Sequence, residues 1–178
     1  MFKQHINTPT HLFLDNTTYF ITSATYLKRH LLVQSEIKES LLSLISESFG
    51  KFGWKLNDWV ILDNHYHLLA VSDKGRDLTK IIKKIHGVSA HFIRQKTGCE
   101  LPVWWNYWDY CPRDDADYYT KLNYLFMNPV KHGYVSDLND YRFSSFSSKL
   151  EKIGRDAMVE QFHNYRCRLD VDEIYDEF

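Results

Sequence analysis

The order of the apolar segments is the feature that most constrains how this chain folds. Four segments show the two-residue period of a strand, and two show the 3.6-residue period of a helix. In chain order they are the strand 18–26, the helix 35–49, the strands 54–62 and 65–72, the helix 77–98 and the strand 102–110. This order is the split βαβ plan. We therefore predict an α+β, ferredoxin-like (RRM-like) fold, an antiparallel sheet with both helices on one face.

Local signals predict where several elements begin and end. Ser35 is expected to cap the first helix, and a turn at Asp63 and Asn64 should join the second and third strands into a hairpin. Asp114 is expected to cap a third helix. Pro129 should stop that helix, because the residue before a proline avoids the helical region.

Length and composition fit one packed domain with an extension. Of the 178 residues, 44% are hydrophobic and 16% aromatic, which is ample for a core. The N-terminus lacks the apolar core of a signal peptide and no run approaches a membrane span, so we expect a cytoplasmic protein. The three cysteines are widely spaced and indicate neither a disulfide framework nor a zinc site. We expect residues 1–149 to form the main domain and 150–178 an acidic extension with a helix over 151–168.

The net charge of −1 conceals an uneven distribution. Residues 73–96 carry seven basic side chains against two acids, whereas residues 151–178 carry four basic side chains against eight acids. A basic segment suits an anionic ligand, because Lys and Arg neutralise phosphates. A basic helix face is more often simply solvated, however, so charge alone does not establish nucleic-acid binding.

His65 and His67 form the first candidate functional pair. Side chains alternate along a strand, so both imidazoles should project from one face, about 7 Å apart along the strand. Histidine is the commonest metal ligand and also a proton carrier at physiological pH. A single His-x-His is nevertheless more often a pair of ordinary, half-buried histidines.

Tyr124 and Asn128 form the second candidate pair. Residues four apart on a helix lie on one face, so the phenol and the amide should point the same way. A phenol can act as a nucleophile, and an amide oxygen is a hard metal ligand. Alone the spacing is a weak signal, because a tyrosine on a helix usually packs.

Taken together, these two stretches resemble a known family. Residues 64–69 (Asn-His-Tyr-His-Leu-Leu) and 124–135 (Tyr-Leu-Phe-Met-Asn-Pro-Val-Lys-His-Gly-Tyr-Val) are similar to the histidine strand and catalytic helix of single-tyrosine HUH transposases, most closely the REP-associated tyrosine transposases. The aromatic strand 103–109 and the segment 141–146 are also similar, so the resemblance runs from about Tyr19 to Phe146. Relatives often carry proline where this chain has Asp63, which leaves the geometry of that turn open.

The resemblance implies a metal-dependent, single-stranded DNA endonuclease and strand transferase, with its catalytic domain in residues 1–149. It implies that Tyr124 is the nucleophile and becomes a 5′-phosphotyrosine, and that His65, His67 and Asn128 hold a divalent ion, Mg²⁺ or Mn²⁺. The expected partner is single-stranded or hairpin DNA of the REP type, with neither ATP nor a membrane involved. We expect the third helix to lie across the open face of the sheet, with both histidines in a surface cleft. Whether the protein is a monomer or a homodimer stays open.

Basic and aromatic side chains near these motifs are candidates for DNA contact. We select Lys80, Lys83, Lys84, Arg94, Trp105, Arg113 and Lys131. Aromatic rings can stack on bases, but about half of the rings on a strand face the core. At most two of the aromatic residues in 104–108 are therefore expected to touch DNA.

Two other functions are compatible with the same fold. One is a non-catalytic, RRM-like nucleic-acid-binding protein, in which surface aromatics stack on bases. The other is a metal-dependent hydrolase in which Tyr124 only packs. A binding protein requires none of His65, His67, Tyr124 and Asn128, so the presence of all four favours the transposase.

Overall fold

The computed structural model describes residue 11 and residues 13–167. Its strands are β1 (Thr18–Thr25), β2 (Lys55–Ile61), β3 (His65–Val71) and β4 (Trp104–Tyr110). Its α-helices are α1 (Ser35–Lys51), α2 (Leu78–Thr97), α3 (Asp115–Lys131), α4 (Phe146–Ile153) and α5 (Arg155–Asn164). Short 3₁₀ turns, η1 (Tyr26–Lys28), η2 (Gly75–Asp77) and η3 (Leu138–Asp140), lie between them.

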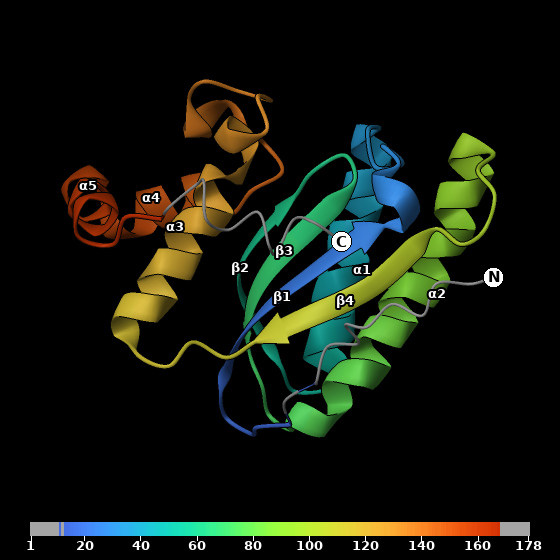
Figure 1. The fold of residues 1–178 in the computed structure, drawn as a ribbon, viewed down its shortest axis with the longest axis horizontal. Helices are drawn as coiled ribbons and strands as arrows, with labels where there is room; N and C mark the ends of the chain where they lie inside the picture. Colours follow the sequence, from blue (N-terminus) through green and yellow to red (C-terminus); the bar gives the residue numbers. More distant parts are fainter. Residues whose placement is uncertain (1–10, 12, 168–178) are drawn as a thin grey trace, which may run out of the picture.

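The four strands form one antiparallel sheet in the order β2-β3-β1-β4. Helices α1 and α2 pack together on one face, and α3 lies on the other, with α4 and α5 beyond it (Figure 1). The predicted ferredoxin-like plan is therefore confirmed. The hairpin of β2 and β3 places β3 in the interior of the sheet, so its two histidines stand on a strand that is paired on both sides.

The sheet separates two apolar cores. The first lies against α1 and α2, and includes Ile21, Leu41, Ile45, Leu68, Ile81 and Ile85. The second lies against α3, α4 and α5, and includes Phe20, Leu69, Leu125, Phe126, Phe146 and Met158. Adjacent residues of β1 and β3 enter opposite cores, as the two-residue period of a strand requires. The face that is open in the two-layer plan is thus covered by a second layer of helices.

Two of the predicted helix boundaries are wrong, and one is confirmed. Asp114 caps α3, accepting a hydrogen bond from the Asp117 backbone N–H at 2.8 Å. Ser35 is instead the first residue of α1, after an N-cap that makes no side-chain bond. Pro129 lies inside the last turn of α3, which continues to Lys131 because a proline there removes only one backbone bond from a helix that is packed on the sheet.

The helix predicted over residues 151–168 is also wrong. Two helices, α4 and α5, replace it, and Gly154 with φ of +84° breaks the chain direction between them. Glycine populates this region without the steric cost of a Cβ atom. The proposed boundary at residues 149 and 150 falls within α4, and residues 168–178, the acidic end, lie outside the described residues.

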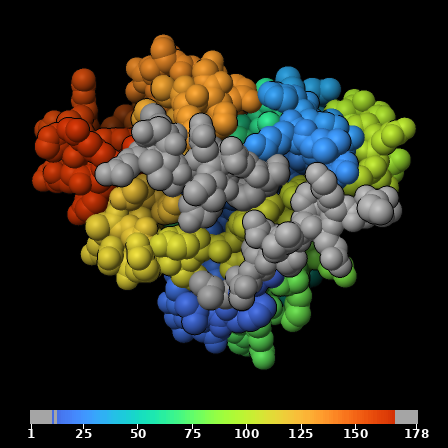
Figure 2. Space-filling model, viewed as in Figure 1, coloured from blue at the N-terminus to red at the C-terminus, as the bar shows by residue number. Residues whose placement is uncertain are grey.

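The connection after β1 is conformationally unusual. Leu27 and Lys28 both have left-handed φ values, 57° and 52°, which non-glycine residues rarely adopt. Arg29 braces this turn: its Nε donates to Tyr26 O at 3.0 Å and its Nη1 to Glu100 O at 3.2 Å. Figure 2 shows the turn (light blue) beside the connection from α2 to β4 (lime) at the surface. The turn is thus held against the segment that leads into β4.

Two sequence expectations concern the chain as a whole. In the described ranges, no helix is long and apolar enough to cross a membrane. Cys99 and Cys111 are free thiols.

Candidate active site

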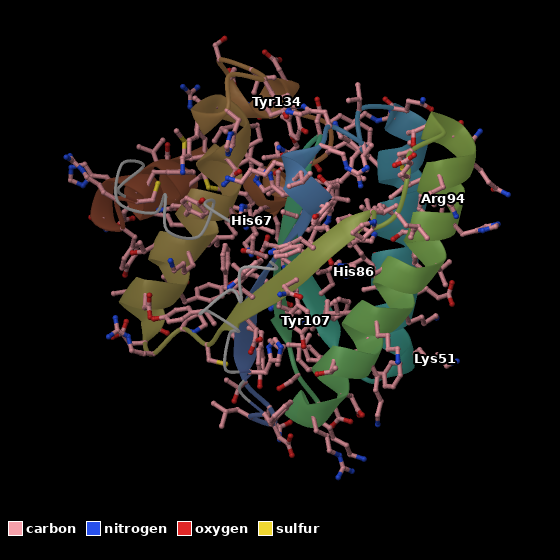
Figure 3. The ribbon with its side chains drawn as sticks, turned by 45° about the vertical axis from the view of Figure 1, so that its right-hand side comes forward. Lys51, His67, His86, Arg94, Tyr107 and Tyr134 are labelled. Carbon is pink, nitrogen blue, oxygen red and sulfur yellow. The ribbon has the colours of Figure 1, made fainter. Side chains whose placement is uncertain are left out.

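The two histidines of β3 project from the same face of the sheet, as the strand period predicts. Their ring centroids are 5.0 Å apart and the rings meet edge to face at 78°. The intervening Tyr66 packs in the opposite core, among the residues against α1 and α2. The pair therefore faces the α3 layer (Figure 3, where His67 is labelled).

Helix α3 brings its two candidate residues to that pair. The Tyr124 ring centroid lies 5.4 Å from that of His67, and Asn128 Oδ1 lies 3.0 Å from His65 Nε2. Residues 124 and 128 are one turn apart, so a single helix face presents both groups. The structure thus unites four side chains from two elements that are far apart in the sequence.

The site is more enclosed than expected. The relative exposures are 8% for His65, 0% for His67, 1% for Tyr124 and 0% for Asn128. The expectation of a surface cleft is therefore wrong. The reason is that α3 packs closely on the sheet, where the Phe20 ring lies between the two layers, 5.3 Å from His67 and 6.2 Å from Tyr124.

The polar atoms at the centre of the site fit a divalent cation. Asn128 Oδ1 can only accept hydrogen bonds, and Asn64 Oδ1 lies 2.7 Å from the other nitrogen of His65, Nδ1. If Nδ1 carries the proton, His65 Nε2 and Asn128 Oδ1 are two acceptors at 3.0 Å. Two ligands at adjacent corners of an octahedron with bonds of about 2.1 Å are about 3.0 Å apart. The spacing is therefore that of two neighbouring metal ligands.

The orientation of the Asn128 amide also fits a bound cation. Its Nδ2 is buried and has no hydrogen-bond partner in the described part of the chain. Leaving a buried donor unsatisfied costs about 1–3 kcal/mol, which a metal bond to Oδ1 would offset. Across residues 11 and 13–167, no three His, Cys, Asp or Glu side chains are placed to hold a metal. The candidate third ligand here is an amide, which suits a hard ion.

The sequence prediction missed Lys121 and His132. The Lys121 ammonium lies 5.9 Å from the Tyr124 ring centroid, and that of Lys131 lies 5.1 Å from it. His132 stands at the end of α3 with its ring 5.1 Å from that of His65. Residues 121, 124, 128 and 131 form one stripe of the helix. A three-residue step back from Tyr124 would therefore have identified Lys121, and a four-residue step from Asn128 would have identified His132.

The basic residues selected on α2 are not brought to this site, because α2 lies on the opposite face of the sheet. Lys80 pairs with Asp77 at 2.8 Å, and Lys84 with Glu47 of α1 at 3.2 Å. Lys83 and Arg94 are exposed, and Arg94 points away from the sheet in Figure 3. These four residues stay predictions as contacts to DNA, on a surface separate from the tyrosine.

The remaining selected residues lie around α3 and β4. Trp105 packs on Tyr26, with ring centroids 5.3 Å apart, near the start of β4. Trp108 pairs with Thr22 in the sheet, so it shares the face of the histidines. Arg113 is exposed before α3 and pairs with Asp117 at 3.3 Å. Trp108, which was not selected, therefore lies on the same face of the sheet as the histidines, across β1 from His67.

Asp117 anchors the start of α3 to β4. It accepts hydrogen bonds from Tyr110 Oη and from the Arg113 backbone at 3.1 Å. Burial raises the pKa of the Asp117 carboxyl, but these hydrogen bonds outweigh it and lower the pKa overall. Burial, and then the neighbouring carboxylate, raise the pKa of Tyr110 to about 12, so this phenol stays a neutral donor. The contact fixes the helix that carries Tyr124 without adding a second nucleophile.

A split βαβ sheet that presents a histidine strand to a helical tyrosine defines a class, the DNA-processing enzymes of the transposase type. Residues 15–110, just over half of the chain, match the family model described as transposase IS200 like, and the chain belongs to this family. The match includes His65 and His67 but ends before α3, so the roles of Tyr124 and Asn128 stay predictions.

Individual relatives agree with this assignment. The chain is 25% identical to the REP-associated tyrosine transposase of Escherichia coli (strain K12) over 136 residues, covering 75% of this chain and 79% of that protein. It is 34% identical over 99 residues to a Haemophilus influenzae protein named as a REP-associated tyrosine transposase, covering 48% and 55%. A solved REP-associated tyrosine transposase bound to a REP hairpin has a TM-score of 0.69 and 23% identity, covering 83% of this chain and 87% of that one. The last match supports the fold.

Proposed function

We propose that this protein is a metal-dependent single-stranded DNA endonuclease and strand transferase whose nucleophile is Tyr124. One observation carries the proposal: α3 packs Tyr124 against His67 while Asn128 Oδ1 stands 3.0 Å from His65 Nε2. A tyrosine ring, two imidazoles and an amide oxygen are thus neighbours in one buried cluster. A protein that only bound nucleic acid would not require this set.

In the proposed reaction the Tyr124 oxygen attacks phosphorus and forms a phosphotyrosine with the 5′ phosphate. The bond from phosphorus to the 3′ oxygen breaks, the phenol loses its proton, and the 3′ oxygen leaves as a hydroxyl group. The new ester conserves the energy of the broken bond, so a 3′ hydroxyl can later attack it and rejoin the strand without ATP. Nicking and joining are thus the same reaction in two directions.

His65, His67 and Asn128 would hold the divalent ion of this site. Bound there, the ion supplies positive charge that polarises the scissile phosphate. Mixed nitrogen and oxygen ligation suits Mg²⁺ or Mn²⁺ among the ions available to a cell. Lys121 and Lys131, on either side of Tyr124 along the helix, would bind the non-bridging phosphate oxygens as the nucleophile approaches.

The proposed substrate is single-stranded DNA next to a hairpin of the REP type. The names of the two relatives and the hairpin in the solved structure support this choice. An enclosed tyrosine also requires a phosphate that can bend out of a helix, which a duplex yields only at a cost in stacking. A phosphate reaches Tyr124 only if groups that cover it in this structure move.

The test compares the unmodified protein with Tyr124→Phe on oligonucleotides that carry a REP-type hairpin and a single-stranded flank, with Mn²⁺. With a 3′ label, the unmodified protein should give a labelled protein-DNA adduct that survives denaturation. With a 5′ label, it should release a shorter free strand. Tyr124→Phe should bind the same DNA but give neither product.

Tyr119→Phe is the matched control, since it removes a phenol oxygen from a half-buried position on the same helix. It should leave both products unchanged. Cleavage without an adduct would identify an activated water as the nucleophile. DNA binding without any cleavage would favour the RRM-like binding function, and either result would refute the proposal.

A further inference from the structure

The side chain next to the first site histidine is placed to control it. Asn64 Oδ1 lies 2.7 Å from His65 Nδ1, on the side of the ring opposite to Asn128. The ring of His65 is therefore held between two amides, one on each nitrogen. In the neutral ring only one of its two nitrogens carries the proton. If one contact requires the proton on its nitrogen, the other nitrogen must be an acceptor.

Asn64 is itself fixed in one orientation. Its Nδ2 donates to the carbonyl oxygen of Lys28 at 3.2 Å, and a carbonyl cannot donate in return. Its Oδ1 must therefore be the atom directed at His65 Nδ1, and this oxygen can only accept. It follows that Nδ1 carries the proton and that the lone pair of His65 lies on Nε2, beside Asn128 Oδ1.

The carbonyl that orients Asn64 comes from the left-handed turn after β1. Leu27 and Lys28 adopt φ values of 57° and 52° there, and the Leu27 side chain is 75% exposed, so packing of that side chain does not explain the conformation. The backbone of Asn64 is tied to the same turn, since its carbonyl accepts from the Thr25 N–H at 2.8 Å. An unusual backbone that persists next to a site is a reason to look for a role in it.

We propose that Asn64 is a positioning residue that locks His65 in the Nδ1–H tautomer, with the turn at Leu27 and Lys28 acting as its anchor. The lock directs the Nε2 lone pair at the point where Asn128 Oδ1 also converges. The tautomer itself stands on the hydrogen bonds alone; its consequence for a metal ion rests on the proposed function. Such partners of a ligating imidazole commonly change metal affinity by about 10- to 100-fold.

The second histidine contacts a hydroxyl group through Nδ1, where the first contacts an amide oxygen. His67 Nδ1 lies 2.8 Å from Thr22 Oγ1, and a hydroxyl can either donate or accept. This contact orients the ring but does not by itself select a tautomer.

The first experiment reads the tautomer in the metal-free protein, by long-range proton-nitrogen NMR of the histidine rings. His65 should be protonated on Nδ1 in the unmodified protein. Asn64→Ala should shift it toward the Nε2–H form, which free imidazole side chains prefer. Asn64→Asp keeps an acceptor at the same place and should restore the Nδ1–H form.

The second experiment measures Mn²⁺ affinity of the same proteins by calorimetry. Asn64→Ala should weaken binding by about tenfold or more, and Asn64→Asp should recover most of it. Asn106→Ala removes an exposed asparagine of β4 and should bind as the unmodified protein does. An Asn64→Ala protein with an unchanged His65 tautomer would overturn the proposal, and so would one with unchanged Mn²⁺ affinity. If no protein forms a DNA adduct while both shifts occur, the proposed function fails and the role of Asn64 stands.

Discussion

Each face of the sheet buries imidazole rings, and the two faces use them differently. On the α2 side, His86 Nε2 lies 2.9 Å from Ser23 Oγ and 3.0 Å from Tyr66 Oη, and the ring stacks on Trp104 at 4.7 Å (Figure 3 labels His86). Both hydroxyls can donate, so they satisfy a neutral ring. Burial lowers the pKa of His86 to about 3, and the ring stays uncharged.

On the α3 side, the partners of the imidazoles are of the opposite kind. His65 Nε2 faces an amide oxygen, which has no proton to give. A ring nitrogen that accepts from hydroxyl groups is complete without a ligand. With the proton of His65 on Nδ1, by contrast, the lone pair of Nε2 faces a second acceptor, and a cation can bind between them. The nature of the partner atoms, more than burial, thus distinguishes the imidazoles on the two faces.

The largest effect should come from replacing either histidine on the α3 side of the sheet by alanine. His65→Ala or His67→Ala should reduce Mn²⁺-dependent cleavage by at least about a thousandfold, since a metal ion contributes several kcal/mol of charge stabilisation. His86→Gln should retain cleavage to within about threefold at a temperature where it is folded. Initial rates on one oligonucleotide, with circular dichroism as a check of folding, measure this contrast. Equal losses in all three variants would remove the distinction between the faces.

The next effect concerns acid stability and belongs to the α2 side. The folded pKa of His86, about 3, lies below its ordinary value of 6.5, so the stability that depends on its neutral form is complete above pH 6.5 and is lost as the pH falls toward 3. Between pH 6.5 and 5 the loss is at most about 2 kcal/mol, at about 1.4 kcal/mol per pH unit. Urea unfolding at pH 7.5 and 5 should therefore show a smaller loss in His86→Gln than in the unmodified protein. An equal loss of unfolding free energy between pH 7.5 and 5 in the two proteins would show that His86 does not cause it.

A third comparison uses the two tryptophans of β4 that differ in position. Trp108→Ala should weaken binding to single-stranded DNA by about 1 kcal/mol or more, because Trp108 shares the face of the histidines and a stacked base contributes roughly 1–3 kcal/mol. Trp105→Ala should change affinity less, since that ring packs on Tyr26. Fluorescence anisotropy with a labelled single strand measures both. The reverse order would restore Trp105 as the principal stacking residue.

The smallest effect is expected from the basic residues of α2. The double variant Lys80→Gln, Lys83→Gln should lower DNA affinity a few-fold and reduce its salt dependence, with little change in the cleavage rate at saturating DNA. Lys121→Gln should instead lower that saturated rate, because its ammonium lies beside Tyr124. Titrations and single-turnover rates at two salt concentrations separate binding from chemistry. A large loss of saturated rate in the α2 variant would contradict the separation of the two faces.

The sequence predicted the features that local geometry determines. The two-residue spacing of His65 and His67 and the four-residue spacing of Tyr124 and Asn128 determine which way side chains point, so each pair could be predicted from the spacing. The resemblance to a known family then joined the two pairs. The alternation of strand and helix periods gave the fold for the same reason. Each of these depends on the chain within one turn or one strand.

What could not be predicted depends on contacts between distant segments. The sequence predicted that the basic side chains of α2 contact DNA. In the structure, Lys84 pairs with Glu47 and Lys96 pairs with Glu36, both of α1. The enclosure of Tyr124 depends on how closely α3 approaches the sheet, which no local pattern encodes. The partner of His65 Nδ1 was a neighbour in the sequence, yet its orientation came from the carbonyl of Lys28, which is 36 residues away.

The position of β3 inside the sheet also determines how the site responds to local opening. The strand is hydrogen-bonded to β1 on one side and to β2 on the other, so its amides exchange with solvent only when one of these neighbouring strands separates from it. Fraying of the chain ends or of the outer helices leaves the two imidazoles at their fixed spacing. The histidines therefore form a stationary half of the cluster, and any motion that uncovers them comes from the elements packed over them.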